Sequence, residues 1–171
     1  MKIILAVSLY LLLFISCQKK HTLNIPPACN IEQVYIDNAK KVTITNGAWG
    51  TVSWVGGDCM PTVPANPNSC MPCPVQRTVK IYEYATLDDI VTNDSSKVFI
   101  DSLKKPLIAQ VDTDVNGFFQ ATLVDGKYTV VIVENGKLYA NSSDGNSGIN
   151  PVRIEKGVVK INLQITYDAA F

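Results

Sequence analysis

The most chemically distinctive residues of the sequence are its five cysteines. Four of them follow Cys17, and an even number of cysteines in an exported protein predicts two disulfides. We expect Cys59 to bond to Cys70 or Cys73, which closes a proline-rich insertion, and Cys29 to fasten the preceding segment to the domain. The alternatives are a zinc ion held by four thiolates and a redox pair formed by Cys70 and Cys73.

Composition excludes several classes of site. His21 is the single histidine, so the core can hold neither a Ser-His-Asp or Cys-His nucleophilic centre nor a His-rich zinc site. The 15 basic and 15 acidic side chains give a formal net charge of zero, which excludes the basic surface of a nucleic-acid-binding protein. The length of 171 residues suits one domain. We therefore expect no catalytic residue, no metal ion and no cofactor.

Two polar segments carry closely spaced oxygen atoms. Asp112–Gly117 matches the first half of an EF-hand calcium loop, but Leu123 occupies the twelfth position, where a bidentate Glu is required. Residues 141–150 are the better candidate for a polar ligand, either a cation or a sugar. The candidate ligand-binding residues in this segment are Asn141, Asp144, Asn146 and Asn150. The same composition is also typical of a solvated loop of turn-forming residues.

The first residues are typical of an export signal. A charged start is followed by an apolar run from Ile3 to Ile15, which is shorter than the roughly 20 residues that a membrane-spanning helix needs. Residues 1–16 therefore predict a cleaved signal peptide.

The end of this signal resembles a bacterial lipobox. The motif Phe14-Ile15-Ser16-Cys17 implies that Cys17 is acylated and becomes the new N-terminus. Residues 17–30 then form a lipidated tether, which partners with the membrane through the lipid anchor. By resemblance to lipoprotein sorting rules, Gln18 after the cysteine favours the outer membrane, at its periplasmic face or at the cell surface.

From Ile31 onward the sequence predicts strands and no helix, because apolar residues do not recur every three and four positions and β-branched residues abound. Val130–Val133 is apolar on both faces, which predicts a central strand covered on both sides. The expected strands are Val42–Thr45, Trp49–Val55, Thr78–Tyr84, Leu107–Val111, Phe118–Leu123, Tyr128–Glu134, Leu138–Ala140, Val152–Ile154 and Val158–Tyr167. Residues 31–171 thus predict a single all-β domain, an antiparallel β-sandwich.

Three turn signals separate these strands. Asn116-Gly117, Asp125-Gly126 and Asn135-Gly136 are pairs that accept the positive φ angles of tight hairpins. The longer segment Leu87–Ser102 has room for one irregular or helical turn.

The motif Thr113-Asp114-Val115-Asn116-Gly117-Phe118-Phe119, followed by Gly126-Lys127-Tyr128-Thr129-Val130, resembles the carboxypeptidase regulatory-like domain. The resemblance covers about residues 47–134 and implies a transthyretin-like (prealbumin-like), immunoglobulin-like sandwich. Residues 58–74 and 135–150 depart from the family pattern, so the resemblance implies the fold but no binding surface. One transthyretin-like branch hydrolyses 5-hydroxyisourate, but its histidines and its Tyr-Arg-Gly-Ser ending have no counterpart here.

These features favour a non-catalytic outer-membrane lipoprotein whose β-sandwich is an interaction or structural module. The alternative is a carbohydrate- or cation-binding accessory lipoprotein of a nutrient-uptake or adhesion system. The partner would then be a protein or a glycan, and a glycan would require aromatic side chains on one face. The available aromatic residues are Trp49, Tyr82, Tyr84 and Tyr139. We expect ligand contacts on Asp58–Pro74 and Asn141–Asn150, because both loops are longer than a hairpin needs.

Overall fold

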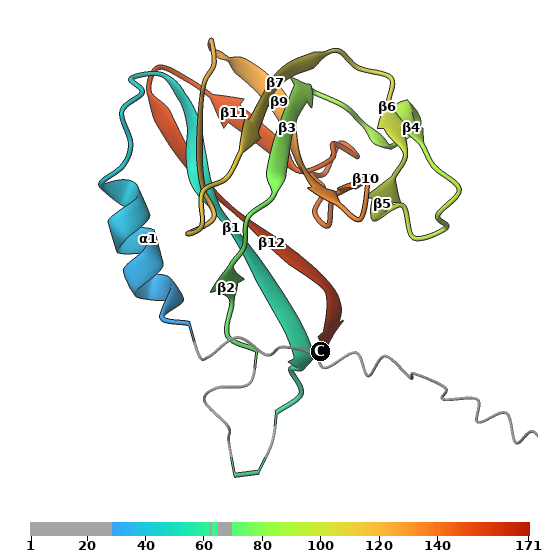
Figure 1. Cartoon of the computed structure of the whole chain (residues 1–171). Coiled ribbons are helices and arrows are strands. Elements are labelled where there is room, and N and C mark those ends of the chain that lie inside the picture. The colour runs from blue at the N-terminus through green and yellow to red at the C-terminus, as the bar shows by residue number, and fades with distance from the viewer. Residues whose placement is uncertain (1–28, 62, 65–69) are drawn as a thin grey trace, which may run out of the picture.

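The computed structural model describes residues 29–61, 63–64 and 70–171, so the predictions for the signal peptide and for Cys17 lie outside the described residues. Two β-sheets pack together, which confirms the all-β sandwich (Figure 1). The first sheet contains β12 (Val158–Ala170), β1 (Gly47–Asp58) and β2 (Cys73–Pro74), with β8 (Phe118–Thr122) also paired to β1. The second contains β5 (Phe99–Ile100), β10 (Lys137–Tyr139), β9 (Gly126–Glu134), β3 (Thr78–Glu83) and β7 (Leu107–Asp112), with β11 (Pro151–Ile154) paired to β9.

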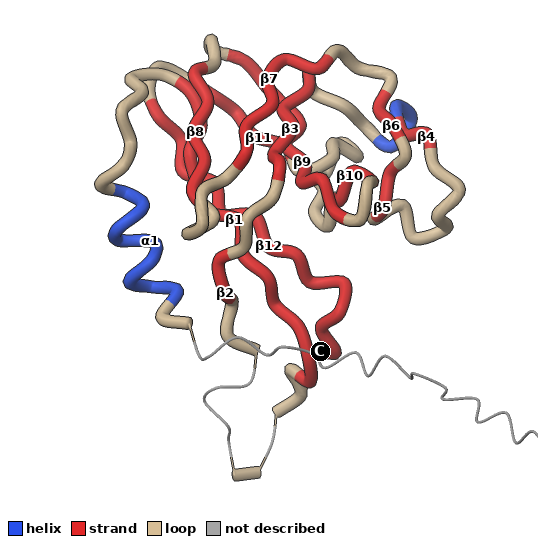
Figure 2. The backbone as a smooth tube through the Cα atoms, viewed as in Figure 1, coloured by secondary structure: helices blue, strands red, loops and turns tan. Residues whose placement is uncertain are grey.

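Four further elements complete the described chain. Helix α1 (Ile31–Ala39) precedes β1, and a 3-10 turn, η1 (Leu87–Asp89), lies in the segment for which a helical turn was predicted. Strands β4 (Ile90–Val91) and β6 (Ser102–Leu103) form a separate two-stranded pair. Figure 2 shows the strands gathered in one body from which the ends of β1 and β12 extend as a stem.

All but one of the predicted strands are present, with shifts of a few residues at their ends. The prediction for Val42–Thr45 was wrong, because this segment is the loop between α1 and β1. The backbone N–H of Thr43 donates to the side chain of Gln120 (3.0 Å), and Gln120 donates back to the Thr43 hydroxyl (2.8 Å). The side-chain amide of Gln120 thus supplies hydrogen bonds to this segment that a neighbouring strand would otherwise supply.

The prediction of no helix from Ile31 onward was also wrong, because α1 begins at this residue. Asn30 caps α1 by accepting a hydrogen bond from the backbone N–H of Gln33 (3.1 Å). The far end is held by Asn38, which is fully buried and donates to Thr51 Oγ1 (2.9 Å) and to the carbonyl of Asn116 (3.0 Å). A nine-residue helix is marginal alone, so these tertiary contacts stabilise it.

The pairing of β1 with β12 departs from the antiparallel pattern. The two strands run parallel from Gly47 beside Val158 to Asp58 beside Ala170, with a bulge after Trp54. Strands β2 to β11 all lie between them in the chain, so no short turn forces them to be antiparallel.

Strand β9 lies at the centre of the second sheet and is covered on both sides, as predicted. Val130 and Ile132 belong to the main core between the sheets, and Val131 belongs to a second apolar cluster on the outer face. The second cluster also includes Ile149, so the polar 141–150 loop helps to cover it.

The turn signals form two kinds of connection. Asn135 and Gly136 have φ values of 51° and 77° and join β9 to β10, which pair as the expected hairpin. The hairpin prediction was wrong for Asn116-Gly117 and Asp125-Gly126, because each joins strands of different sheets. These two turns therefore connect the two layers of the sandwich.

Candidate ligand-binding surface

The structure contains two disulfides, Cys29–Cys73 and Cys59–Cys70. This pairing agrees with the predicted one, in which Cys59 closes the insertion and Cys29 fastens the preceding segment. Cys70 and Cys73 have different partners, so they do not form the alternative redox pair. Since all four sulfur atoms are bonded in pairs, the zinc site with four thiolates is not formed either.

The two loops that were expected to carry ligand contacts lie at different places. The cysteine-rich insertion follows β1 at the end of the stem, whereas residues 141–150 join β10 to β11 in the body (Figure 1). The described residues of the insertion therefore do not form one site with the 141–150 loop.

The carboxylate of Asp144 organises the 141–150 loop. It accepts hydrogen bonds from the backbone N–H groups of Asn146 and Gly148 (both 2.8 Å), from the Tyr84 hydroxyl (3.1 Å) and from Lys127 Nζ (2.8 Å). The Lys127 ammonium, followed by the Gly148 N–H, lowers the pKa of Asp144 well below its ordinary value. This carboxylate is saturated by donors of the protein itself, which disfavours it as a cation ligand.

The three predicted asparagine ligands have different surroundings. Asn150 is buried and accepts hydrogen bonds from the backbone N–H (2.9 Å) and hydroxyl (2.8 Å) of Ser142. Asn141 is exposed, and its amide donates to the Gln164 carbonyl and to Thr166 Oγ1 (both 3.1 Å). The side chain of Asn146 is exposed. Only Asn141 and Asn146 thus present side chains outward, and Asn141 is fixed on the edge of β12.

The pH dependence of this loop follows from Asp144. Because its folded pKa lies below the unfolded value near 3.8, the ionised form stabilises the loop above about pH 4. As the pH falls from that value through the lower folded pKa, this stabilisation is lost, and protonation of the folded carboxylate removes the hydrogen bonds that it accepts. We expect amide exchange of Asn146 and Gly148 to accelerate in this range, as measured by NMR. An Asp144→Asn variant should exchange fast at every pH, and an unchanged acid profile in that variant would contradict the assignment.

Asp112 and Asp114, the carboxylates of the EF-hand-like segment, have partners within the protein. Asp114 accepts from the backbone N–H groups of Asn116 (2.8 Å) and Phe118 (3.0 Å) and pairs with Lys41 (2.7 Å). Asp112 accepts from the Thr78 hydroxyl (2.6 Å). Among the described residues there is also no group of three or more His, Cys, Asp or Glu residues that could hold a metal ion.

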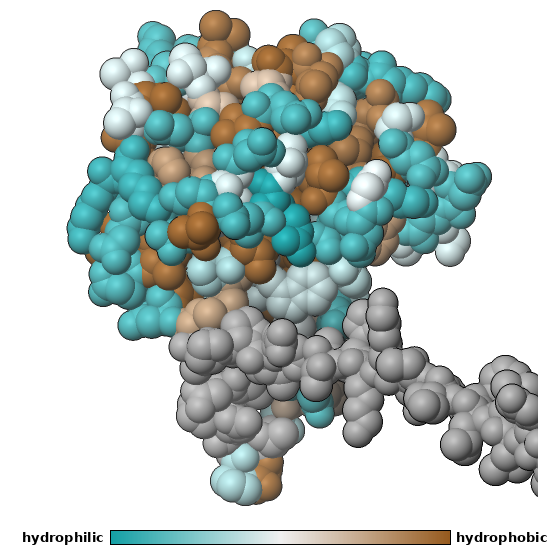
Figure 3. Space-filling view, in the orientation of Figure 1, coloured by the Kyte–Doolittle hydropathy of each residue, from teal (hydrophilic) through white to brown (hydrophobic). Residues whose placement is uncertain are grey.

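The aromatic residues singled out from the sequence do not form one exposed face. Tyr82 and Tyr139 are buried in the core, Trp49 lies beneath the ammonium of Lys160 (5.5 Å to the ring centroid), and the Lys127 ammonium lies over Tyr84 (3.8 Å). The hydrophilic surface of the view in Figure 3 is interrupted only by scattered apolar patches.

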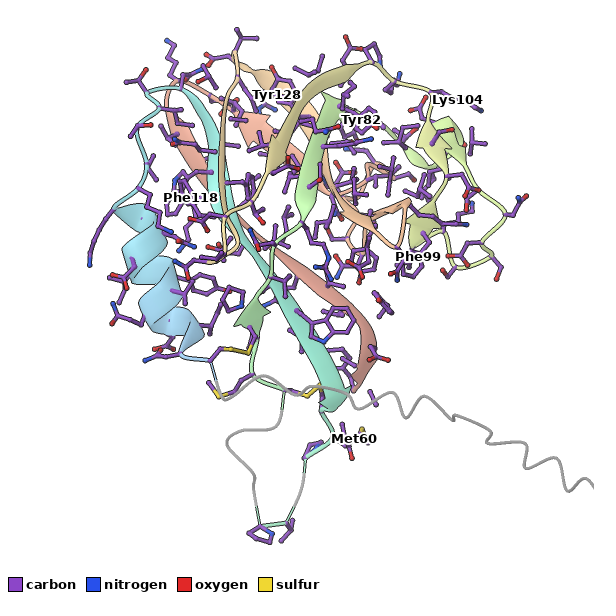
Figure 4. All side chains as sticks on the ribbon, viewed as in Figure 1. Met60, Tyr82, Phe99, Lys104, Phe118 and Tyr128 are labelled. Atoms are coloured by element: carbon purple, nitrogen blue, oxygen red, sulfur yellow. A yellow bond between two sulfur atoms is a disulfide. The ribbon has the colours of Figure 1, made fainter. Side chains whose placement is uncertain are left out.

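A different aromatic group, which sequence reasoning missed, lies where the stem meets the body. Tyr167 of β12 contacts Trp54 of β1 (ring centroids 5.1 Å apart) and Phe99 of β5 (5.0 Å), and its ring is also 5.8 Å from Tyr139. Figure 4 shows Phe99 at the lower edge of the body. The sequence signal was the alternating run Val158–Tyr167, which places Tyr167 on a strand but does not indicate its neighbours.

A buried ion pair supports this aromatic group. Glu134 is 4% exposed; it pairs with Arg77 and accepts a hydrogen bond from the Tyr167 hydroxyl (3.1 Å). The same hydroxyl accepts from the Asn135 amide (3.1 Å). Burial, aided by the charge of Glu134, raises the pKa of Tyr167, so this hydroxyl stays protonated and can donate.

Two clefts lie on the surface that the described residues form. A cleft of about 630 Å³ lies at the start of β9 and the end of β11, and its lining includes Lys127, which pairs with Asp144, and Arg153, which pairs with Glu155. A recess of about 260 Å³ lies beside Asn141 and Val98. Its lining combines apolar side chains with serines and an asparagine.

No protein-family model, curated protein sequence or solved structure matches this chain. The resemblance to the carboxypeptidase regulatory-like domain therefore stays a prediction. Within the described part of the chain, no helix has both the length and the apolar character needed to cross a membrane.

Proposed function

We propose that the protein is a non-catalytic outer-membrane lipoprotein, anchored through Cys17, whose sandwich is an interaction module. This proposal rests on the hydrogen bonds that the polar side chains of the 141–150 loop make within the protein. Asp144 and Asn150 are engaged by other groups of the protein, so they hold the loop in shape instead of forming a reactive centre. A rigid surface of this kind suits binding.

The disulfides support an exported location, because such bonds persist in oxidising compartments. The bond between Cys29 and Cys73 also fastens the first described residues to β2, near the stem (Figure 1). A tether running from Cys17 would therefore reach the domain at this end, leaving the body away from the membrane.

The proposal includes a transthyretin-like sandwich of the carboxypeptidase regulatory-like type. The motif residues that carry the resemblance have structural roles that suit a shared fold. Thr113 Oγ1 accepts from the Arg77 N–H (2.8 Å), Asp114 closes the turn, and the Gly117 carbonyl accepts from the Val52 N–H (2.8 Å). These contacts join β3, β8 and β1 around one turn.

The anchor is tested by replacing Cys17 with Ala in the full-length chain expressed in a bacterium with an outer membrane. We expect the protein to move from the membrane fraction to the soluble fraction, because the acylated residue is lost. The control is Gln18→Ala, which should remain acylated and membrane-bound. Mass spectrometry of the N-terminal peptide checks for the lipid directly, and a Cys17→Ala protein that still sediments with membranes would contradict the anchor.

A further inference from the structure

We propose that the aromatic group of Trp54, Phe99 and Tyr167, together with the adjoining recess beside Asn141, binds an uncharged oligosaccharide. This inference rests on the proposed function, since it names the ligand class of the interaction module. It uses residues from β1, β5 and β12 and from the loop after β10, which are brought together only by the fold.

The exposed ring of Tyr167 is held in place by its neighbours. Tyr167 is 40% exposed, yet its ring contacts Trp54 and Phe99 nearly edge to face, at interplanar angles of 89° and 67°. Its hydroxyl is held by Glu134 and by Asn135. An aromatic side chain that exists only to fill the core would be covered, whereas a fixed and exposed ring loses little conformational entropy when a ligand stacks on it.

The chemistry of an aromatic face favours a sugar. The π-face of a ring is electron-rich and attracts the weakly positive C–H groups of a flat ligand. A pyranose ring has one face made largely of such C–H groups and a rim of hydroxyls. It can therefore stack on Tyr167 or on the partly exposed Trp54 while its hydroxyls find polar partners.

Polar groups of this kind adjoin the rings. Val98 lines the recess and precedes Phe99, and Asn141 lines it while donating to Thr166, the neighbour of Tyr167. The hydrogen bonds of the Asn141 side chain to Gln164 and Thr166 both use its amide nitrogen, which leaves its carbonyl oxygen as an acceptor for a ligand hydroxyl. Ser96, Ser142 and Ser143 add hydroxyls to the recess. The recess has a volume of about 260 Å³, which suits one sugar unit of the oligosaccharide. The next sugar unit would then lie on the rings.

The charges around the rings and the recess favour an uncharged ligand. The carboxylate of Glu134 is neutralised by Arg77, and no carboxylate lines the recess. Lys97 is the charged residue in the recess lining, and it is exposed. The surface thus offers stacking and neutral hydrogen bonds, which predicts binding that is insensitive to salt.

A proline-rich peptide is the other ligand that aromatic surfaces commonly bind, because its prolines insert between rings. Here the rings of Trp54, Tyr167 and Phe99 touch at centroid distances near 5 Å and at steep angles. They leave no slot between them for a prolyl ring. The geometry therefore favours a ligand that lies on the rings.

The test titrates the full-length lipidated protein, in a detergent without a sugar headgroup, with cellohexaose, maltohexaose, xylohexaose and mannohexaose. The chain has two tryptophans, so the two indole N–H signals in an NMR spectrum serve as an internal control. We expect saturable binding of at least one hexasaccharide that shifts the Trp54 signal and leaves that of Trp49 unchanged. This readout uses the wild-type protein and does not depend on the folding of any variant.

Variants then assign the site. Trp54→Leu and Tyr167→Leu should each weaken binding about tenfold or more, as measured by calorimetry, while the matched control Trp49→Leu binds normally. No saturable binding of any hexasaccharide overturns the proposal, as does binding that shifts only Trp49. Binding of a proline decapeptide at Trp54 in place of the sugars overturns it in favour of a peptide ligand. None of these outcomes affects the lipid anchor, which fractionation of Cys17→Ala tests separately.

Discussion

Replacing Cys29 and Cys73 together with serine is expected to lower the free energy of unfolding by about 4 kcal/mol. The bond closes a loop with a sequence separation of 44, and the loss follows from the loop-closure entropy that the unfolded chain regains. The same bond fixes the start of α1 against β2, so we also expect amide exchange in α1 to accelerate. Urea denaturation and NMR exchange measure the two effects.

The matched control is the double replacement of Cys59 and Cys70. This pair spans a sequence separation of 11, for which the same entropy argument gives about 3 kcal/mol, and it does not touch α1. We therefore expect α1 to keep its exchange protection in the control. Equal loss of protection in both variants, or no loss in Cys29→Ser with Cys73→Ser, would contradict the role assigned to the first bond.

Gly117→Ala is expected to lower the free energy of unfolding by about 3 kcal/mol. Gly117 has φ = 68°, and a Cβ atom there would lie 2.2 Å from the carbonyl oxygen of Val52. The variant therefore combines the cost of a left-handed residue with a clash against β1. That clash falls beside the hydrogen bond between the Gly117 carbonyl and the Val52 N–H, which joins the turn to the first sheet.

The Gly136→Ala variant separates the cost of the left-handed backbone conformation from the cost of the clash. Gly136 has a similar φ of 77°, but nothing lies within 4 Å of the position of an added Cβ. We expect this control to lose only about 1 kcal/mol, from the backbone conformation alone. Denaturation of both variants in urea measures the difference, and equal losses would show that the contact with Val52 is not what requires glycine at position 117.

The strands were predictable because their signal is local. The apolar run in β9 and the alternation in β8 and β12 can be read from a few consecutive residues. Helix α1 also carried a signal, with Ile31, Val34 and Tyr35 at helical spacing after a capping Asn30. It was missed because the fourth position of that face is Asn38, whose burial depends on Thr51 and Asn116.

The sheet to which each strand belongs could not be predicted from its neighbouring residues alone. The turn after Asp114 has the residues of a hairpin, but whether β8 continues one sheet or crosses to the other depends on its pairing with β1. The parallel partner of β1 is likewise more than one hundred residues away.

The candidate surface was even less accessible to sequence reasoning. Asn141 was singled out for its polar neighbours, and the structure gives it a fixed place on the edge of β12. Trp54, Phe99 and Tyr167 lie 45 and 68 residues apart along the chain, and only the packing of three strands joins their rings. No spacing rule predicts such a group.

The bond between Cys29 and Cys73 also determines how the domain would bear mechanical load. Tension applied to the chain before Cys29 passes through the sulfur atoms to β2, which pairs with β1. Helix α1 begins two residues after Cys29 and lies outside this shortest covalent path, so pulling does not peel it from the sheet turn by turn. A pull on the chain before Cys29 would thus load a cross-linked strand directly, with the helix outside the shortest covalent path.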